Sequence, residues 1–282
     1  KEGDKVLVQP PVYHPFMWLT ERNKRTLVLN PLKCENGVYQ MDMEAFREQV
    51  KGCKLFILCN PHNPGGIVWK EEELREIAEI CYDEGVLVFS DEIHADLTLP
   101  PHKHRPFATI SEKAKMNSVT FMSPSKAFNM PGMTASHAII YNPELRHQLR
   151  EFIEACELDL GHAFAFLSVE AAYSHGTEWL DQCLTYIQGN IDYVDAFLKE
   201  HAPKIKAIRP QASYLIWLDC REMNLSQKAL NDFFVDKAHL ALNDGAIFGK
   251  GQGDGFMRLN VASPRSVIEK AMKQLADAYQ QL

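Results

Sequence analysis

Four short segments of the sequence carry side chains that could do chemistry on a bound ligand. Three of them follow apolar runs: Asn60-Pro-His-Asn-Pro-Gly-Gly66, Ser90-Asp-Glu-Ile-His94 and Ser123-Pro-Ser-Lys126. The fourth is Arg258, inside the apolar run Phe256-Met-Arg-Leu-Asn-Val261. Because α/β sheets bind their ligands at the ends of their strands, this placement indicates a ligand site.

Lys126 and Arg258 are cationic residues with a clear chemical use. A lysine in a turn flanked by serine and proline is usually solvated, but the hydroxyls of Ser123 and Ser125 could hold a phosphate beside it. A desolvated amine in that position is a competent nucleophile toward a carbonyl group. An arginine within an apolar strand either points to solvent or is buried with a partner, and the planar guanidinium of Arg258 suits a substrate carboxylate.

The remaining segments each have a simpler interpretation beside the functional one. Asp91 follows the apolar run of residues 86–89, where a carboxylate is costly to desolvate unless a cation meets it. The alternative is that Asp91 caps the N-terminus of a helix. The segment 60–66, taken alone, is most simply a proline- and glycine-rich turn. Each signal is weak singly, and their order and shared position at strand ends give them weight.

The elements that must position these residues alternate between strands and helices in the first part of the chain. Nearly continuous apolar strands separated by amphipathic helices predict a mainly parallel sheet covered on both faces. The second part suits a smaller α+β domain entered through a long helix, and we predict domains at 1–178 and 179–282. The predicted strands are 6–8, 27–29, 55–58, 86–89, 119–121, 138–141, 214–218 and 256–261, and the predicted helices are 43–51, 71–84, 143–157, 164–173, 178–199 and 266–279.

Composition excludes several classes of protein. The chain has 282 residues with 30 Lys+Arg against 37 Asp+Glu, and its net charge of −7 argues against binding to nucleic acid or an anionic membrane. No apolar run approaches the roughly 18–20 residues that span a bilayer. Seven scattered cysteines without a CxxC pair indicate a reducing, cytoplasmic setting. His102-x-His104 lacks a third ligand, so we predict a surface loop there and no metal site.

Six segments in order resemble the fold type I pyridoxal-phosphate enzymes, the class I/II aminotransferase superfamily of aspartate aminotransferase. The finer resemblance is to its cystathionine β-lyases of the MalY/PatB type, which are C–S lyases. The resemblance covers essentially the whole chain. It is carried by Pro10-Pro-Val-Tyr-His-Pro-Phe16, Asn60-Pro-His-Asn-Pro-Gly65, Ser90-Asp-Glu-Ile-His94, Ser125-Lys-Ala-Phe-Asn129, Tyr214-Leu-Ile-Trp-Leu218 and Phe248-Gly…Phe256-Met-Arg-Leu-Asn260…Ser263-Pro-Arg265.

The resemblance implies that pyridoxal 5'-phosphate (PLP) is the cofactor and that four residues act on its aldehyde, ring nitrogen or phenolic oxygen. Lys126 is implied as the catalytic lysine that bonds to the cofactor aldehyde and later removes the substrate's α-proton. Asp91 is implied to pair with the pyridinium nitrogen, which keeps the ring an electron acceptor. Asn63 is implied to donate to the phenolic oxygen. His94 stands where most aminotransferases have a tyrosine near that oxygen, and histidine there is typical of the lyase branch.

Further positions receive cofactor or substrate roles from the same resemblance. Tyr13 is implied to stack on the face of the ring, and Ser123 and Ser125 to hold the phosphate. Arg258 is implied to bind the α-carboxylate of an amino-acid substrate. One departure is Thr134, which stands where the superfamily often has a phosphate-binding arginine. This departure leaves the phosphate short of positive charge.

The resemblance predicts a cytoplasmic, homodimeric enzyme that acts on a small amino acid. The expected reaction is α,β-elimination on cystathionine or a related sulfur amino acid, which gives a thiol, pyruvate and ammonia. Transamination by an aminotransferase starts with the same proton abstraction and stays an alternative, as does a non-catalytic regulatory module. The chain opens at Lys1 without a counterpart of the family's N-terminal segment, so we expect an N-terminally truncated large domain.

Overall fold

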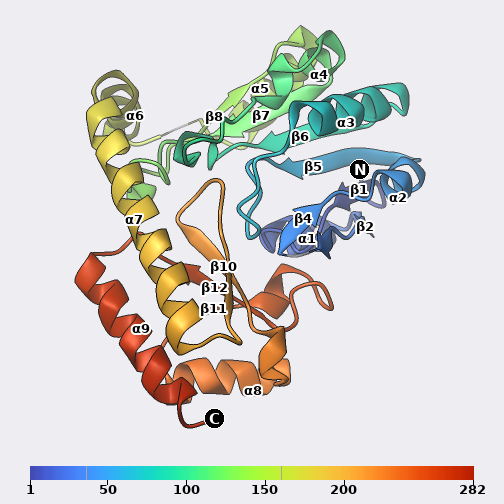
Figure 1. Ribbon diagram of the computed structural model, residues 1–282. Helices are drawn as coiled ribbons and strands as arrows, with labels where there is room; N and C mark the ends of the chain where they lie inside the picture. Colours follow the sequence, from blue (N-terminus) through green and yellow to red (C-terminus); the bar gives the residue numbers. More distant parts are fainter. Residues whose placement is uncertain (36, 160) are drawn as a thin grey trace.

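The computed structural model describes residues 1–35, 37–159 and 161–282, and its larger unit is built on a six-stranded sheet (Figure 1). The strand order is β2-β1-β5-β6-β7-β8. All neighbours pair in parallel except β7 and β8, which are antiparallel. The prediction of a mainly parallel sheet is therefore confirmed. The strands are β1 (Lys5–Val8), β2 (Thr26–Leu29), β5 (Cys53–Cys59), β6 (Leu87–Asp91), β7 (Ser118–Met122) and β8 (His137–Ile139).

The register of the central strands decides which loops meet. Cys59 at the end of β5 lies beside Asp91 at the end of β6. Asp91 in turn lies beside Phe121 near the end of β7. The segments that follow these strands therefore leave the sheet at one edge, which is where α/β proteins bind ligands.

Helices cover the two faces of this sheet unequally in the described residues. On one face α2 (Met43–Gln49), α3 (Glu71–Asp83) and α4 (Glu112–Met116) share a continuous apolar core with the strands. On the other face α1 (Pro15–Arg22) packs against the ends of β1 and β5. The outward-facing side chains of Ile57, Phe89 and Phe121 on that second face remain half-buried.

The smaller unit is an antiparallel sheet with the strand order β11-β12-β10-β9. The long helix α7 (Thr177–His201) and the closing helix α9 (Arg265–Tyr279) pack together and share its apolar core (Figure 1). Helices α5 (Pro143–Ala155) and α6 (Ala163–His175) precede α7. The remaining elements are β9 (Lys206–Ile208), β10 (Leu215–Asp219), β11 (Asn243–Asp244), β12 (Phe256–Asn260) and α8 (Gln227–Asp232).

The two units pack tightly against each other. Trp217 of β10 is fully buried in the apolar core of the large sheet, and its indole N–H donates to the Tyr39 hydroxyl at 3.0 Å. Tyr39 belongs to the hairpin β3 (Lys33–Glu35) and β4 (Val38–Gln40), which the sequence patterns did not reveal because the strands are short. The division at 178/179 falls at the start of α7 and stays a prediction. No described helix is both long and apolar enough to cross a membrane.

Candidate active site

A cavity of about 360 Å³ lies at the carboxyl ends of the large sheet, between this sheet and the smaller unit. Segments far apart in the sequence line it. Six of the residues singled out in the sequence reach it: Tyr13, Asn63, Asp91, His94, Lys126 and Arg258. The structure therefore brings these six together, and their individual roles stay predictions.

Asp91 ends β6 with a carboxylate that has no cationic partner within ion-pair distance among the described residues. One carboxylate oxygen accepts from the backbone N–H of Ile93 at 3.2 Å. Burial raises the pKa of Asp91 to about 6, although this hydrogen bond and the positive charge of Lys126 oppose the shift. A bound cation beside Asp91 would relieve this desolvation cost.

Lys126 lies in the turn that follows β7, and its side chain faces the same cavity. Its amine forms no hydrogen bond or ion pair with the described residues. The turn is held by Ser123, whose hydroxyl donates to the carbonyl of Ala135 at 2.6 Å and accepts from the backbone N–H of Ser125 at 3.1 Å. These bonds fix the position at which Lys126 leaves the backbone.

Ser123 and Ser125 flank the cavity without lining it. Ser123 borders an adjoining apolar hollow that also contains Asp91, and Ser125 borders a second cavity on the other side of Lys126. Their hydroxyls lie 2.8 Å apart and hydrogen-bond to each other. Thr134 immediately precedes Ala135, whose carbonyl accepts from Ser123, and has a left-handed φ of 49°, an unusual conformation for a β-branched residue. The phosphate role of the two serines stays a prediction.

Arg258 crosses from the smaller unit into the cavity. Its guanidinium donates to the Asn63 side-chain oxygen at 2.9 Å and to the Asn243 side-chain oxygen at 2.8 Å, and it lies 4.7 Å above the ring of Phe248. Its Nε is buried without a partner in the described part of the chain. Burial lowers the pKa of Arg258, and no described carboxylate pairs with it. This arrangement leaves a guanidinium that can bind a ligand carboxylate.

His94 is buried and neutral. Burial lowers its pKa to about 3, and the positive charges of Lys126 and Arg258 contribute to the shift. Its Nδ1 has no hydrogen-bond partner among the described residues, and its ring meets Tyr214 edge to face at 6.3 Å. A neutral imidazole offers one donor and one acceptor, so His94 can hydrogen-bond a ligand without bringing charge.

Asn63 is positioned by the turn after β5. The backbone N–H of Asn63 donates to the Cys59 sulfur at 3.4 Å, and its side-chain oxygen is occupied by Arg258. The amide NH₂ is then the group that Asn63 can offer as a donor. Gly66 closes the turn at φ +66°, and a Cβ there would lie 2.6 Å from the Pro210 side chain. This segment is therefore a tightly packed structural element as well as a turn.

The sequence patterns missed one buried polar cluster beneath the site. The Glu92 side chain is fully buried, and one of its oxygens accepts from both the Ser90 hydroxyl at 2.8 Å and the Phe107 N–H at 2.9 Å. His104 Nε2 lies 2.7 Å from the second Glu92 oxygen, and the His104 side chain is 8% exposed. The prediction of a surface loop is therefore wrong for His104, because the loop folds inward to pair with a carboxylate. The described residues contain no cluster suited to a metal ion.

The chain belongs to the aminotransferase class I and II family, whose model matches residues 1–275. Cystathionine beta-lyase PatB of Bacillus subtilis is 42% identical over 278 residues, covering 98% of this chain and 72% of that protein. Protein MalY of Escherichia coli is 32% identical, covering 98% of this chain and 70% of that protein. These relatives confirm the resemblance to the MalY/PatB branch.

Solved structures agree with the fold. The crystal structure of cystalysin from Treponema denticola, which contains pyridoxal 5'-phosphate, superposes with a TM-score of 0.95 at 35% sequence identity. The match covers 100% of this chain and 72% of that chain. The expected aspartate-aminotransferase-like fold is therefore confirmed.

The cavity fits this cofactor chemically. A pyridinium nitrogen would supply the cation that the Asp91 carboxylate lacks, and an aldehyde would find the uncommitted amine of Lys126. The His94 ring and the amide NH₂ of Asn63, which both line the cavity, can hydrogen-bond a ring oxygen. Within this cavity, His94 Nδ1 and Arg258 Nε are buried polar atoms without a described partner, as expected where a ligand binds.

Proposed function

We propose that this protein is a PLP-dependent C–S β-lyase that converts cystathionine or a related sulfur amino acid into a thiol, pyruvate and ammonia. The observation that supports it most is the convergence of Lys126, Asp91 and Arg258 on one cavity. The similarity to a cystathionine β-lyase at 42% identity supports the choice of reaction.

Each residue of the cavity has its own role in the proposed reaction. When bound, PLP would supply an aldehyde reactive toward amines and a ring that accepts electrons. Asp91 would hold a proton on the ring nitrogen, and Asn63 would donate from its amide to the ring oxygen. Arg258 binds the α-carboxylate and so orients the Cα–H bond, and the amine of Lys126 takes the α-proton.

His94 distinguishes this site from the tyrosine-bearing aminotransferases. Because the pKa of His94 is about 3, its ring carries no positive charge at neutral pH. It therefore does not compete with Lys126 or Arg258 for an anionic group. It acts as a neutral hydrogen-bonding group at the ring oxygen. Transamination stays the alternative, since both reactions begin with proton removal by Lys126.

The test incubates PLP-loaded protein with L-cystathionine and follows pyruvate and free thiol. We expect both products in equal amounts and their loss in Lys126→Ala. Conversion of the cofactor into its pyridoxamine form without pyruvate would instead support an aminotransferase. Failure to bind PLP and to turn over any amino acid would support a non-catalytic module.

We further infer a homodimer in the cytoplasm. Exposed apolar side chains gather on α5, α6 and the segment between them, among them Phe152, Leu158, Phe164 and Phe166, each more than 60% exposed. Exposed apolar patches of this kind mark protein interfaces. The seven cysteines are free thiols, which suits a reducing compartment. Light scattering coupled to size-exclusion chromatography tests the dimer.

A further inference from the structure

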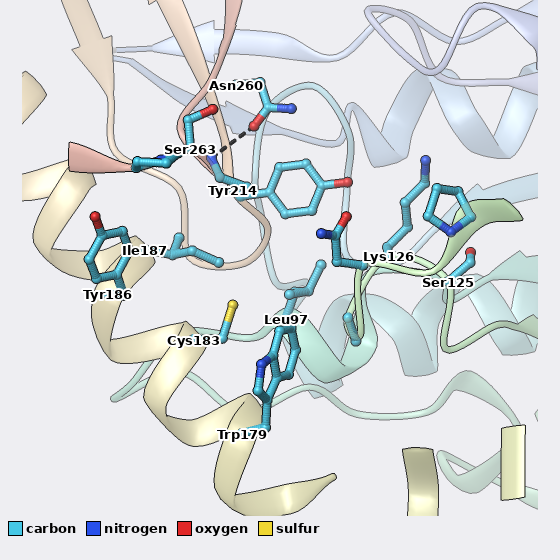
Figure 2. A pocket seen from close by; sticks show the side chains of 15 residues that line it. Leu97, Ser125, Lys126, Trp179, Cys183, Tyr186, Ile187, Tyr214, Asn260 and Ser263 are labelled. Atoms are coloured by element: carbon cyan, nitrogen blue, oxygen red, sulfur yellow. Dashed lines mark hydrogen bonds between the residues drawn. The ribbon is translucent and has the colours of Figure 1, made fainter. Parts of the chain in front are cut away.

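A second cavity of about 300 Å³ adjoins the proposed cofactor site on the other side of Lys126 (Figure 2). Lys126, Tyr214 and Asn260 line both cavities, so the two are neighbours. Figure 2 shows the Tyr214 side chain extending toward Lys126, with residues of α7 forming the wall farther from the lysine.

The walls of this second cavity carry little charge. Leu97, Trp179, Cys183 and Ile187 make its far side apolar. Burial raises the pKa of the Cys183 thiol, so this group is uncharged at neutral pH. Apart from Lys126, none of its described lining residues is charged at neutral pH. A charged group placed against this far wall would find no described residue of opposite charge there, whereas an apolar group would gain contact with the wall.

The position of this second cavity relative to Arg258 indicates which part of the substrate enters it. Arg258 and Asn260 are two residues apart on β12, so their side chains leave the same face of the strand. An amino acid whose carboxylate lies on Arg258 and whose Cα lies at Lys126 has Asn260 and Tyr214 beside it. Its side chain can then extend past Tyr214 toward α7.

We propose that this cavity receives the sulfur substituent of the substrate and selects uncharged, apolar thiol leaving groups. This inference rests on the proposed lyase function. In the reaction Lys126 removes the α-proton, a Cα–Cβ double bond forms, and the Cβ–S bond breaks with its electron pair on sulfur. The thiolate takes up a proton, and hydrolysis with one water gives thiol, pyruvate and ammonium.

The proposal separates two substrates that share the same reacting centre. The leaving group of L-cystathionine is homocysteine, which carries an ammonium and a carboxylate. The leaving group of S-benzyl-L-cysteine is uncharged and apolar. We expect the PLP-loaded protein to have a kcat/KM for S-benzyl-L-cysteine at least about tenfold higher than for L-cystathionine, the size of effect that one apolar group in contact with an apolar wall can give.

A substitution that fills the second cavity with a larger side chain provides the mutational test. Cys183→Phe places a ring at the half-buried cavity wall, and Gln182→Phe places the same ring at the exposed neighbouring position on α7. We expect Cys183→Phe to lower kcat/KM for S-benzyl-L-cysteine at least about tenfold by overpacking and to leave L-cysteine within about twofold. Gln182→Phe should leave both substrates unchanged.

Two results would overturn the proposal. One is a preference for L-cystathionine, and the other is an equal effect of Cys183→Phe on all substrates. A complete lack of pyruvate from every substrate would refute the lyase function itself. The cavity is then tested without turnover, by equilibrium dialysis of S-benzyl-L-cysteine against PLP-loaded Lys126→Ala and Lys126→Ala/Cys183→Phe. Equal affinities refute the cavity's role, and about tenfold weaker binding to the double variant supports it.

Discussion

Replacing His104 by leucine should destabilise the protein by breaking a buried hydrogen-bonded pair that no sequence pattern indicated. Glu92 has a side chain with no exposed surface, and it accepts from three donors: Ser90, Phe107 and His104. Leucine approximates the volume of the imidazole but cannot donate. The second oxygen of Glu92 would then be buried without any described partner.

The expected cost follows from this geometry. Stranding a buried acceptor costs about 1–3 kcal/mol, and stranding one member of a buried ion pair costs about 3–5 kcal/mol. Because two of the three donors to Glu92 remain, we expect a loss of about 3 kcal/mol in the free energy of unfolding. For a chain of this size that corresponds to a fall in Tm of about 6–12 °C.

The measurement is urea unfolding of PLP-loaded protein at pH 7, followed by circular dichroism. His102→Leu is the matched control, because His102 lies in the same loop and is exposed. Its effect should stay within about 0.5 kcal/mol. His104→Gln should recover part of the loss, since its amide can donate to Glu92. If His104→Leu is no more destabilising than His102→Leu, the pair contributes nothing and the reasoning is wrong.

Three further predictions concern the site and its turn. The pKa of Asp91 is about 6 in the folded protein against an ordinary 3.8, so the folded state binds this proton more tightly than the unfolded state. The stability of the cofactor-free protein should therefore fall as pH rises through this interval. Asp91→Asn should therefore raise its Tm at pH 7 but not at pH 4, while abolishing lyase activity; an equal Tm change at both pH values would contradict this sign. Gly66→Ala should cost more than Gly52→Ala in urea unfolding, because both have positive φ but only Gly66 meets Pro210 at 2.6 Å; equal costs would exclude the clash. Arg258→Lys should lower kcat/KM by about 10²-fold through loss of bidentate carboxylate binding, and an unchanged value would remove Arg258 from that role.

Local sequence patterns were sufficient for the main elements of the large sheet. Apolar runs bounded by polar turns located β5, β6 and β7 within a few residues, because a strand buried on both faces needs a short, continuous run of apolar residues. The shortest strands were not predicted from these patterns. Strands β3, β4, β9 and β11 contain two or three residues each, too few for any period to show.

The sequence by itself determined which reactive side chains are present and which strand each of them follows. This information was enough to select the residues of the candidate site. The tertiary structure alone decided how they interact. Arg258 donates to Asn63 across 195 positions of the chain, and His104 turns inward to Glu92. The pKa values of Asp91 and His94 are likewise set by burial and by charges on other segments. Hydrogen bonding and desolvation depend on distances in space, and a pattern of neighbours along the chain carries no information about those distances.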